Sequence, residues 1–227
     1  MPEGLNVEVA HKLSDHEHEA TRSDRWHELV EVLEVAMLAI VAIATAWSGF
    51  QAAKWDSRQA LLYGQSSRDR FQADDLSTAG GQTLVADSAG FNSWLQARSA
   101  NDRTAMTILE RRFSPEYHVA FEAWLKTDPF TNPKAPPGPA FMPQYINPRK
   151  QEAARINEEA SRKFDEGTDA RENADKYVRD TVLFASVLFL IAMAQRMKGR
   201  GSKLSLNIIA GALLVFVLIS VVALPRA

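Results

Sequence analysis

Two apolar runs, Thr181–Ala194 and Leu204–Leu224, fill most of the C-terminal part of the chain. The link between them, Gln195–Lys203, is short and holds four Lys and Arg residues. A helix needs about 20 apolar residues to cross a bilayer, because each residue advances it by only about 1.5 Å. The second run has this length, and the first reaches it when its polar flanks are included. The pattern predicts a transmembrane hairpin with helices at 181–197 and 204–224 and a basic link at 198–203.

A third apolar run, Leu29–Phe50, lies near the N-terminus. From Val35 to Trp47 it carries no charged residue, which is typical of a helix in hydrocarbon. The stretch before it is acidic and no small-residue cleavage site follows it, which argues against a cleavable signal peptide. The sequence therefore predicts an all-α membrane protein with three transmembrane helices, the first at 24–50, and a helical bundle or stalk outside the membrane.

The sidedness of the chain follows from its basic residues. Short basic links between membrane helices stay in the cytoplasm, so the link predicts a cytoplasmic N-terminus and an extracytoplasmic segment at 51–180. The basic edges of that segment argue the other way, although long segments cross largely regardless of charge. We expect the chain in the inner membrane of a bacterium, with an acidic, disordered tail at 1–23.

The segment between the membrane helices reads as helical. It holds 18 Lys and Arg and 19 Asp and Glu residues, which gives no electrostatic basis for binding nucleic acid. Residues 51–126 predict extramembrane helices, with a break at Gly80-Gly81 and a second helix from Leu84 to Arg112. Ser114-Pro115 predicts the start of a further helix, with Ser114 as the N-cap and Pro115 at the first helical position.

A proline-rich strap is predicted at 127–148, which contains seven of the chain's ten prolines. Proline fixes φ and removes a backbone donor, so this stretch is expected to be extended. It also holds four large apolar residues: Phe130, Phe141, Met142 and Tyr145. Two interpretations are open: these side chains pack on the chain's own helices, or they dock a partner.

A long charged helix is predicted at 149–180, leading directly into the second membrane helix. A narrow apolar stripe at three- and four-residue spacing runs along it, with Gly167 as a candidate bend. Such a stripe fits packing on the helices of residues 51–112, or a coiled coil between subunits.

Glu31 and Glu34 place charge at the start of the first membrane helix. Ionisable groups in lipid are costly and tend to face protein or water. The second membrane helix ends on the same side of the membrane, so we expect the two carboxylates near three polar residues: Gln195, Arg196 and Lys198. Three interpretations are open: an ion pair that locks the bundle, a carboxylate ring at a pore mouth, or a proton relay or metal site with His27.

The order of segments also carries a resemblance. A juxtamembrane stretch runs from Gln51-Ala52-Ala53-Lys54-Trp55 to Tyr63-Gly64-Gln65, after an alanine-rich membrane helix, and a charged helix later leads into the membrane hairpin. In this layout the chain resembles a family of uncharacterised bacterial integral membrane proteins, a domain of unknown function. The resemblance covers the ends of the chain and implies one N-terminal and two C-terminal transmembrane helices. It supplies no catalytic residues.

No catalytic, cofactor or metal motif stands out in the sequence, so we expect neither enzyme activity nor a cofactor. The long amphipathic helices and the strap predict a non-catalytic membrane scaffold or accessory subunit. Its partners would be the lipid bilayer and either further copies of itself or another membrane protein. The alternative is a small homo-oligomeric ion channel with Glu31 and Glu34 at the pore mouth.

Overall fold

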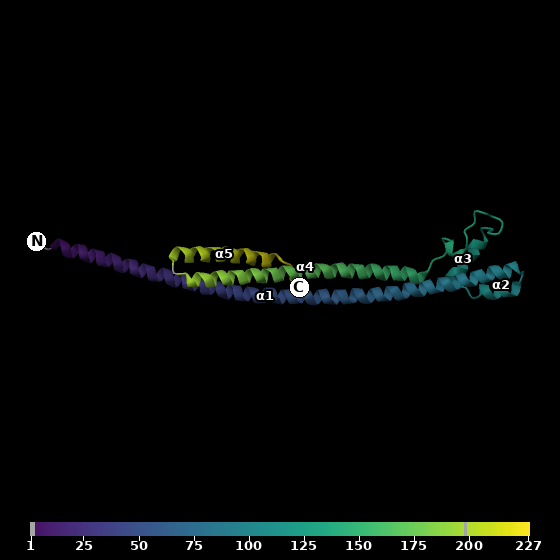
Figure 1. Cartoon of the computed structure of the whole chain (residues 1–227), viewed down its shortest axis with the longest axis horizontal. Helices are drawn as coiled ribbons and strands as arrows, with labels where there is room; N and C mark the ends of the chain where they lie inside the picture. The colour runs from purple at the N-terminus through teal and green to yellow at the C-terminus, as the bar shows by residue number, and fades with distance from the viewer. Residues whose placement is uncertain (1–2, 198) are drawn as a thin grey trace. The chain divides into compact units, whose positions relative to one another are not determined.

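The computed structural model describes residues 28–197 and 199–227, and in this part the chain is helical and contains no strand. The predictions for the tail at 1–23, for His27 and for Lys198 lie outside it and stay predictions. The elements follow in the order α1 (Glu3–Ser99), α2 (Arg103–Glu110), α3 (Pro115–Leu125), the 3-10 turn η1 (Pro139–Phe141), α4 (Pro148–Arg196) and α5 (Arg200–Ala223) (Figure 1).

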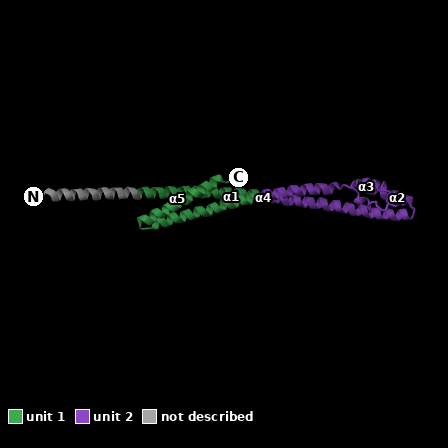
Figure 2. Cartoon of the chain, turned by 90° about the horizontal axis from the view of Figure 1, so that it is seen from above, with its two compact units in different colours: residues 1–59, 168–227 green, residues 60–167 purple. Residues whose placement is uncertain are grey.

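The chain forms two compact units (Figure 2). Unit 1 comprises Met1–Gln59 and Thr168–Ala227, and unit 2 comprises Ala60–Gly167. Because α1 and α4 are long, each contributes one part to unit 1 and another part to unit 2.

Unit 1 is a bundle of α1, α4 and α5, and each of these helices is long and apolar enough to cross a membrane. The prediction of an all-helical chain with three such helices is confirmed at this level. Buried apolar side chains from all three helices form one core, among them Val41, Val187, Ile191 and Val217. Large apolar side chains also cover its outside, as Ile43, Phe189 and Phe216 illustrate.

The connection between α4 and α5 is shorter than the predicted link at 198–203. α4 ends at Arg196, and α5 begins at Arg200 after Gly199, whose extended backbone is the N-cap. Lys203 therefore lies in the first turn of α5 rather than in the link. Because α5 begins this early, Lys203 can turn toward the interior of the bundle, where it pairs with Glu34.

In unit 2, α1 and α4 pack through small side chains. Ala73, Ala153 and Ile156 share a core, and the hydroxyl of Ser66 donates to the carbonyl of Ala160 at 2.7 Å. A short ion pair joins Lys163 Nζ and Asp69 Oδ2 at 2.6 Å. This hydrogen bond to Asp69, followed by one to Glu159, raises the pKa of Lys163.

The predicted break at Gly80-Gly81 is wrong, because α1 runs through both glycines to Ser99. A Cβ at Gly80 would lie 2.9 Å from Asn147 Oδ1, so this glycine allows close approach of the segment before α4. α1 ends instead before Asn101, whose φ of 57° is left-handed. Asp102 then caps α2 by accepting from the Ala105 N–H at 2.9 Å. The predicted helix from Leu84 to Arg112 is thus divided between α1 and α2.

The other elements of unit 2 enclose an aromatic cluster with the last turns of α1. Its buried members are Phe91, Trp94, Phe113, Tyr117, Phe121, Trp124 and Met142. Edge-to-face contacts are frequent in it, including Trp94 with Phe121 at 4.9 Å between ring centroids. The predicted N-cap of α3 is confirmed, since Ser114 Oγ accepts from the Tyr117 N–H. Asp87 of α1 in turn accepts from both the N–H and the hydroxyl of Ser114.

We predict opposite effects of alanine at two glycines of unit 2. A Cβ at Gly167 would lie 2.6 Å from ring atoms of Tyr63, which is itself stacked on Phe164, so Gly167→Ala should lower the free energy of unfolding by about 1–3 kcal/mol. At Gly64 an added Cβ meets nothing within 4 Å, so Gly64→Ala should raise it by about 0.5–1 kcal/mol through helix propensity. Denaturant unfolding of the full chain followed by circular dichroism measures both, and a stabilised Gly167→Ala protein would contradict the close contact.

Candidate functional site

A buried carboxylate marks one end of the bundle in unit 1. Glu34 of α1 is only 2 % exposed, although it lies in the apolar run of the sequence. Its Oε1 accepts from Asn207 Nδ2 at 2.6 Å and lies 3.3 Å from Lys203 Nζ. Lys203 and Asn207 are four residues apart, so they lie on one face of α5 and meet Glu34 together. We call these three residues the Glu34 layer.

Two of the three residues predicted around Glu34 are exposed, and the third, Lys198, lies outside the described residues. Gln195 and Arg196, at the end of α4, are exposed, and so is Glu31. Three-residue spacing puts Glu31 and Glu34 on neighbouring positions of a helix, but the packed face of α1 runs through Glu34, Met37 and Val41 and leaves Glu31 outside. The partners of Glu34 are Lys203 and Asn207, and one feature of the sequence indicates Asn207. Asn207 is the only strongly polar residue near the start of an apolar helix, and such a residue faces protein.

A second polar layer lies at the other end of the same bundle. Asp180 of α4 is fully buried, and its Oδ2 accepts from the hydroxyl of Ser220 on α5 at 3.0 Å. Arg179, whose side chain is mostly exposed, approaches Asp180 Oδ1 at 3.3 Å. We call Asp180, Ser220 and Arg179 the Asp180 layer. No sequence pattern predicts this layer, because Asp180 stands at the edge of an apolar run, where charged residues are ordinary.

The register of the helices places Ser48 at the level of the Asp180 layer. Glu34 and Asn207 are bonded, and Ser48 and Ser220 follow them by 14 and 13 residues on two helices that run in the same direction. At about 1.5 Å per residue, both lie about 20 Å beyond the Glu34 layer. Ser48 is fully buried, and its Oγ has no hydrogen-bond partner among the described residues.

Between the two layers the buried side chains are all apolar. They include Met37, Val41 and Ala44 on α1, Phe184, Val187 and Ile191 on α4, and Ala210, Leu214 and Val217 on α5. The layers therefore act separately: the Glu34 layer joins α1 to α5, and the Asp180 layer joins α4 to α5. Each layer is a buried carboxylate whose negative charge is compensated by a nearby cation and a hydrogen-bond donor inside an apolar bundle.

The four apolar residues of the strap divide into two groups. Met142 is buried in the aromatic cluster. The ring of the half-buried Tyr145 contacts the ring of Tyr117, with 5.8 Å between the ring centroids. Phe130 is partly exposed and lies under the guanidinium of Arg98, 3.7 Å from ring centre to Cζ. Phe141 is 70 % exposed. Met142, Tyr145 and part of Phe130 therefore pack on the chain's own helices, whereas Phe141 does not.

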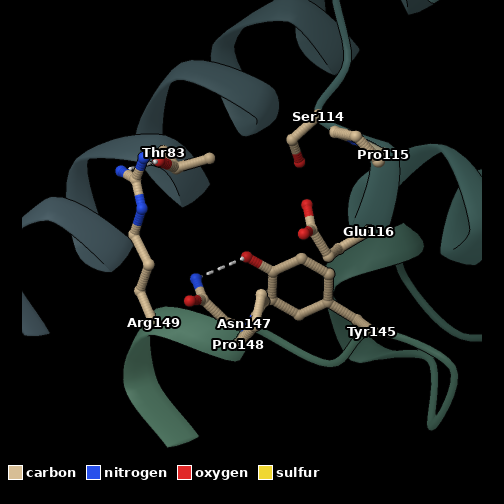
Figure 3. Close-up of a pocket in the computed structure, with 8 residues that line it drawn as sticks. All are labelled: Thr83, Ser114, Pro115, Glu116, Tyr145, Asn147, Pro148 and Arg149. Atoms are coloured by element: carbon tan, nitrogen blue, oxygen red, sulfur yellow. Dashed lines mark hydrogen bonds between the residues drawn. The ribbon is translucent and has the colours of Figure 1, made fainter. Parts of the chain in front are cut away.

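A shallow pocket lies beside the strap in unit 2 (Figure 3). The carboxylate of Glu116 and the side chain of Arg149 lie on opposite sides of it, and Arg149 donates to Thr83 Oγ1 at 3.5 Å. Ser114 also lines the pocket, but its hydroxyl donates to Asp87. No histidine is among the lining residues, so Ser114 has no histidine base beside it in this pocket.

Two titratable side chains of α3, Tyr117 and His118, lie next to this pocket but take no part in a metal site among the described residues. Burial, and to a smaller extent the negative charge of Asp87, raises the pKa of Tyr117 to about 12. His118 lies on α3, 3.5 Å from the carboxylate of Glu122 and well exposed. Within residues 28–197 and 199–227 no three His, Asp or Glu side chains gather closely enough to hold a metal ion.

We predict that the ion pair of the Glu34 layer stabilises unit 1 chiefly by compensating Glu34. Lys203→Met should lower the free energy of unfolding by about 3 kcal/mol, because it leaves a buried carboxylate without its cation. The double variant Glu34→Leu/Lys203→Met should recover most of this loss. Arg196→Met removes an exposed cation from the end of α4 and should change stability by less than about 0.5 kcal/mol. Equal effects of Lys203→Met and Arg196→Met, measured by unfolding in mixed detergent micelles, would contradict the assignment.

Neither a family model, nor a curated protein, nor a solved structure matches this chain. The resemblance to an uncharacterised bacterial membrane family therefore stays a prediction from the sequence.

Proposed function

We propose that this chain is a non-catalytic integral membrane scaffold or accessory subunit. Unit 1 would anchor it in the bilayer through α1, α4 and α5, which have the necessary length and composition. Unit 2 would act by helical self-association or by binding another membrane protein.

The observation that carries this proposal is a stretch of α1 in unit 2 that exposes apolar side chains and almost no charge. From Leu76 to Ala97 the only charged residue is Asp87, which is buried and bonded to Ser114. Val85, a large apolar side chain in this stretch, is 69 % exposed, and Phe71, five residues before the stretch begins, is 72 % exposed between the charged residues Arg70 and Asp74. A helix face in contact with water is ordinarily rich in charged residues. A face with exposed apolar side chains and no charge fits one that another protein covers.

The outer face of α4 in unit 2 provides an internal comparison. Between Pro148 and Gly167 it exposes alternating charges, among them Arg155, Glu158, Arg162 and Asp165. The part of α1 that packs on these turns of α4 also exposes charges, among them Arg68 and Asp74, so the contrast is with the stretch of α1 from Leu76 to Ala97. It supports a partner on the α1 side.

The spacing on α1 favours a helix as that partner. Five exposed, uncharged residues follow one another at intervals of seven: Gly64, Phe71, Thr78, Val85 and Asn92. Seven-residue spacing keeps side chains on one face of helices that wind around each other. We therefore propose coiled-coil contacts along this column, with the exposed Phe141 of the strap as a second contact.

The channel alternative receives no support from the placement of its two carboxylates. Glu34 is buried in one bundle and compensated by Lys203, whereas Glu31 is exposed. A pore mouth lined by both carboxylates requires both groups to face a common axis.

The location that we propose is the bacterial inner membrane, with the N-terminus in the cytoplasm and unit 2 outside it. The basic residues at 196–203 support this orientation. Lys203 still counts toward this orientation although it is paired with Glu34, because the number of Lys and Arg residues governs the orientation of a membrane helix.

We predict that Phe71→Gln/Val85→Gln weakens association of the purified full chain, with itself or with a co-purifying partner, by tenfold or more. Each change removes an apolar side chain that would be buried on binding, worth about 1.5 kcal/mol or more per side chain. Native mass spectrometry of the protein, extracted mildly from its own membrane, measures the stoichiometry. The matched control is Glu158→Gln/Arg162→Gln on α4, which should leave it unchanged. If the α1 variant keeps the same stoichiometry as the wild type, the proposed contact surface is wrong.

A further inference from the structure

One exposed stripe of α1 in unit 1 changes character along its length. It begins with Ile43, continues with Trp47 and Phe50, and ends with Lys54, all of them exposed. The order is aliphatic, aromatic and then cationic, at three- and four-residue spacing that keeps the residues on one face. The same order is met on going from the hydrocarbon of a bilayer through the interface to the headgroups.

Cationic groups gather at the end of this stripe. Lys54 Nζ lies 5.8 Å from the ring centre of Phe50, and the guanidinium carbon of Arg58 lies 5.5 Å from the ring centre of Trp55. Neither cation is held in a salt bridge with a described residue, and both are exposed. The rings therefore hold the two cations at the surface by cation–π contacts and leave their N–H donors available.

The segment after α5 brings a third cation to the same place. The carbonyl of Pro225 accepts from Trp55 Nε1 and from the Tyr177 hydroxyl, both at 3.2 Å. The N–H of Ala227 donates to Gln51 Oε1 at 3.2 Å. Arg226 stands between these two anchored residues, and its side chain is exposed. Its backbone is thus fixed beside Trp55.

The acidic residues around Trp55 do not balance these cations. Asp56 is exposed, and it is the only carboxylate in the stretch of α1 from Trp47 to Gln59. On α4, Asp180 is buried and is already bonded to Ser220 and approached by Arg179. Three exposed cations therefore face the Asp56 carboxylate and the α-carboxylate of Ala227, which leaves a net charge of about +1 at an aromatic belt.

We propose that Lys54, Arg58 and Arg226, gathered around Trp55, bind the headgroup phosphate of an anionic phospholipid whose acyl chain lies along Ile43, Trp47 and Phe50. Charge complementarity favours an anionic lipid over a zwitterionic one, because the cations attract the net negative charge of its headgroup and repel a choline ammonium. The aromatic rings give the patch a fixed depth in the membrane. The proposal rests on the membrane anchoring of the proposed function and adds a lipid partner to it.

The test is a titration of the full chain in neutral detergent micelles with phosphatidylglycerol, followed by native mass spectrometry. The wild type should retain phosphatidylglycerol at least tenfold better than phosphatidylcholine, and Lys54→Gln/Arg58→Gln should lose about tenfold in apparent affinity for it. The control is Lys126→Gln/Lys134→Gln, which removes two exposed cations from unit 2 and should leave binding unchanged. Circular dichroism checks that both variants keep their helices.

Three results would overturn the proposal: equal retention of the two lipids by the wild type, unchanged binding by Lys54→Gln/Arg58→Gln, or an equal loss in the control. Flotation of the protein with liposomes of pure phosphatidylcholine separates this failure from a failure of membrane anchoring. A chain that floats without a preference for phosphatidylglycerol refutes only the lipid site. A chain that does not float refutes the anchoring as well.

Discussion

The apolar outer surface of unit 1 is the constraint on which our account of this chain depends. At most a third of each apolar window in α1, α4 and α5 is buried inside the protein, so most of these side chains face outward. A helix in water buries its apolar stripe and exposes a polar one. Three adjacent helices that are apolar on both sides are suited to hydrocarbon, where helices can satisfy all their backbone hydrogen bonds internally.

This constraint explains why two carboxylates of unit 1, Glu34 and Asp180, point inward. Glu34 and Asp180 are among its most buried residues, and each meets partners on a neighbouring helix. The two layers lie about 20 Å apart, which is shorter than the hydrocarbon thickness of about 30 Å. Each layer therefore fixes the register of α5 against another helix. Apolar packing alone would allow the helices to shift along each other. Specific registry is the best-attested role of buried polar groups of this kind.

Unit 2 follows ordinary rules for a protein in water, with one exception. Its core is aromatic, its buried indoles find acceptors, as Trp124 Nε1 does in the carbonyl of Pro136, and the outer face of α4 is charged. The exception is the stretch of α1 from Leu76 to Ala97, which exposes Val85 and carries no exposed charge. Our proposal of a partner rests on this departure from the local rule.

The helices could be predicted because their signals are local. The apolar runs have the length of membrane spans, and Ser114-Pro115 carries the side-chain cap that starts α3. The break at Gly80-Gly81 was predicted wrongly because a helix tolerates glycine, at a cost of about 1 kcal/mol, where packing requires close approach. The partners of Glu34 depend on the register between α1 and α5, and no local pattern specifies that register. The division of the strap into buried Met142 and exposed Phe141 likewise depends on tertiary contacts.

A cysteine-accessibility scan tests the central claim most directly, because the chain has no cysteine of its own. Single cysteines would replace Ile43, Phe189 and Phe216, exposed apolar residues of the three helices of unit 1, and Leu61, an equally apolar and exposed residue of α1 in unit 2. Our account predicts that a membrane-impermeant maleimide labels only the cysteine at Leu61 in intact spheroplasts, and labels the other three only after denaturation. Labelling of all four at similar rates would contradict insertion of unit 1, and labelling at Leu61 only after permeabilisation would reverse the proposed sidedness.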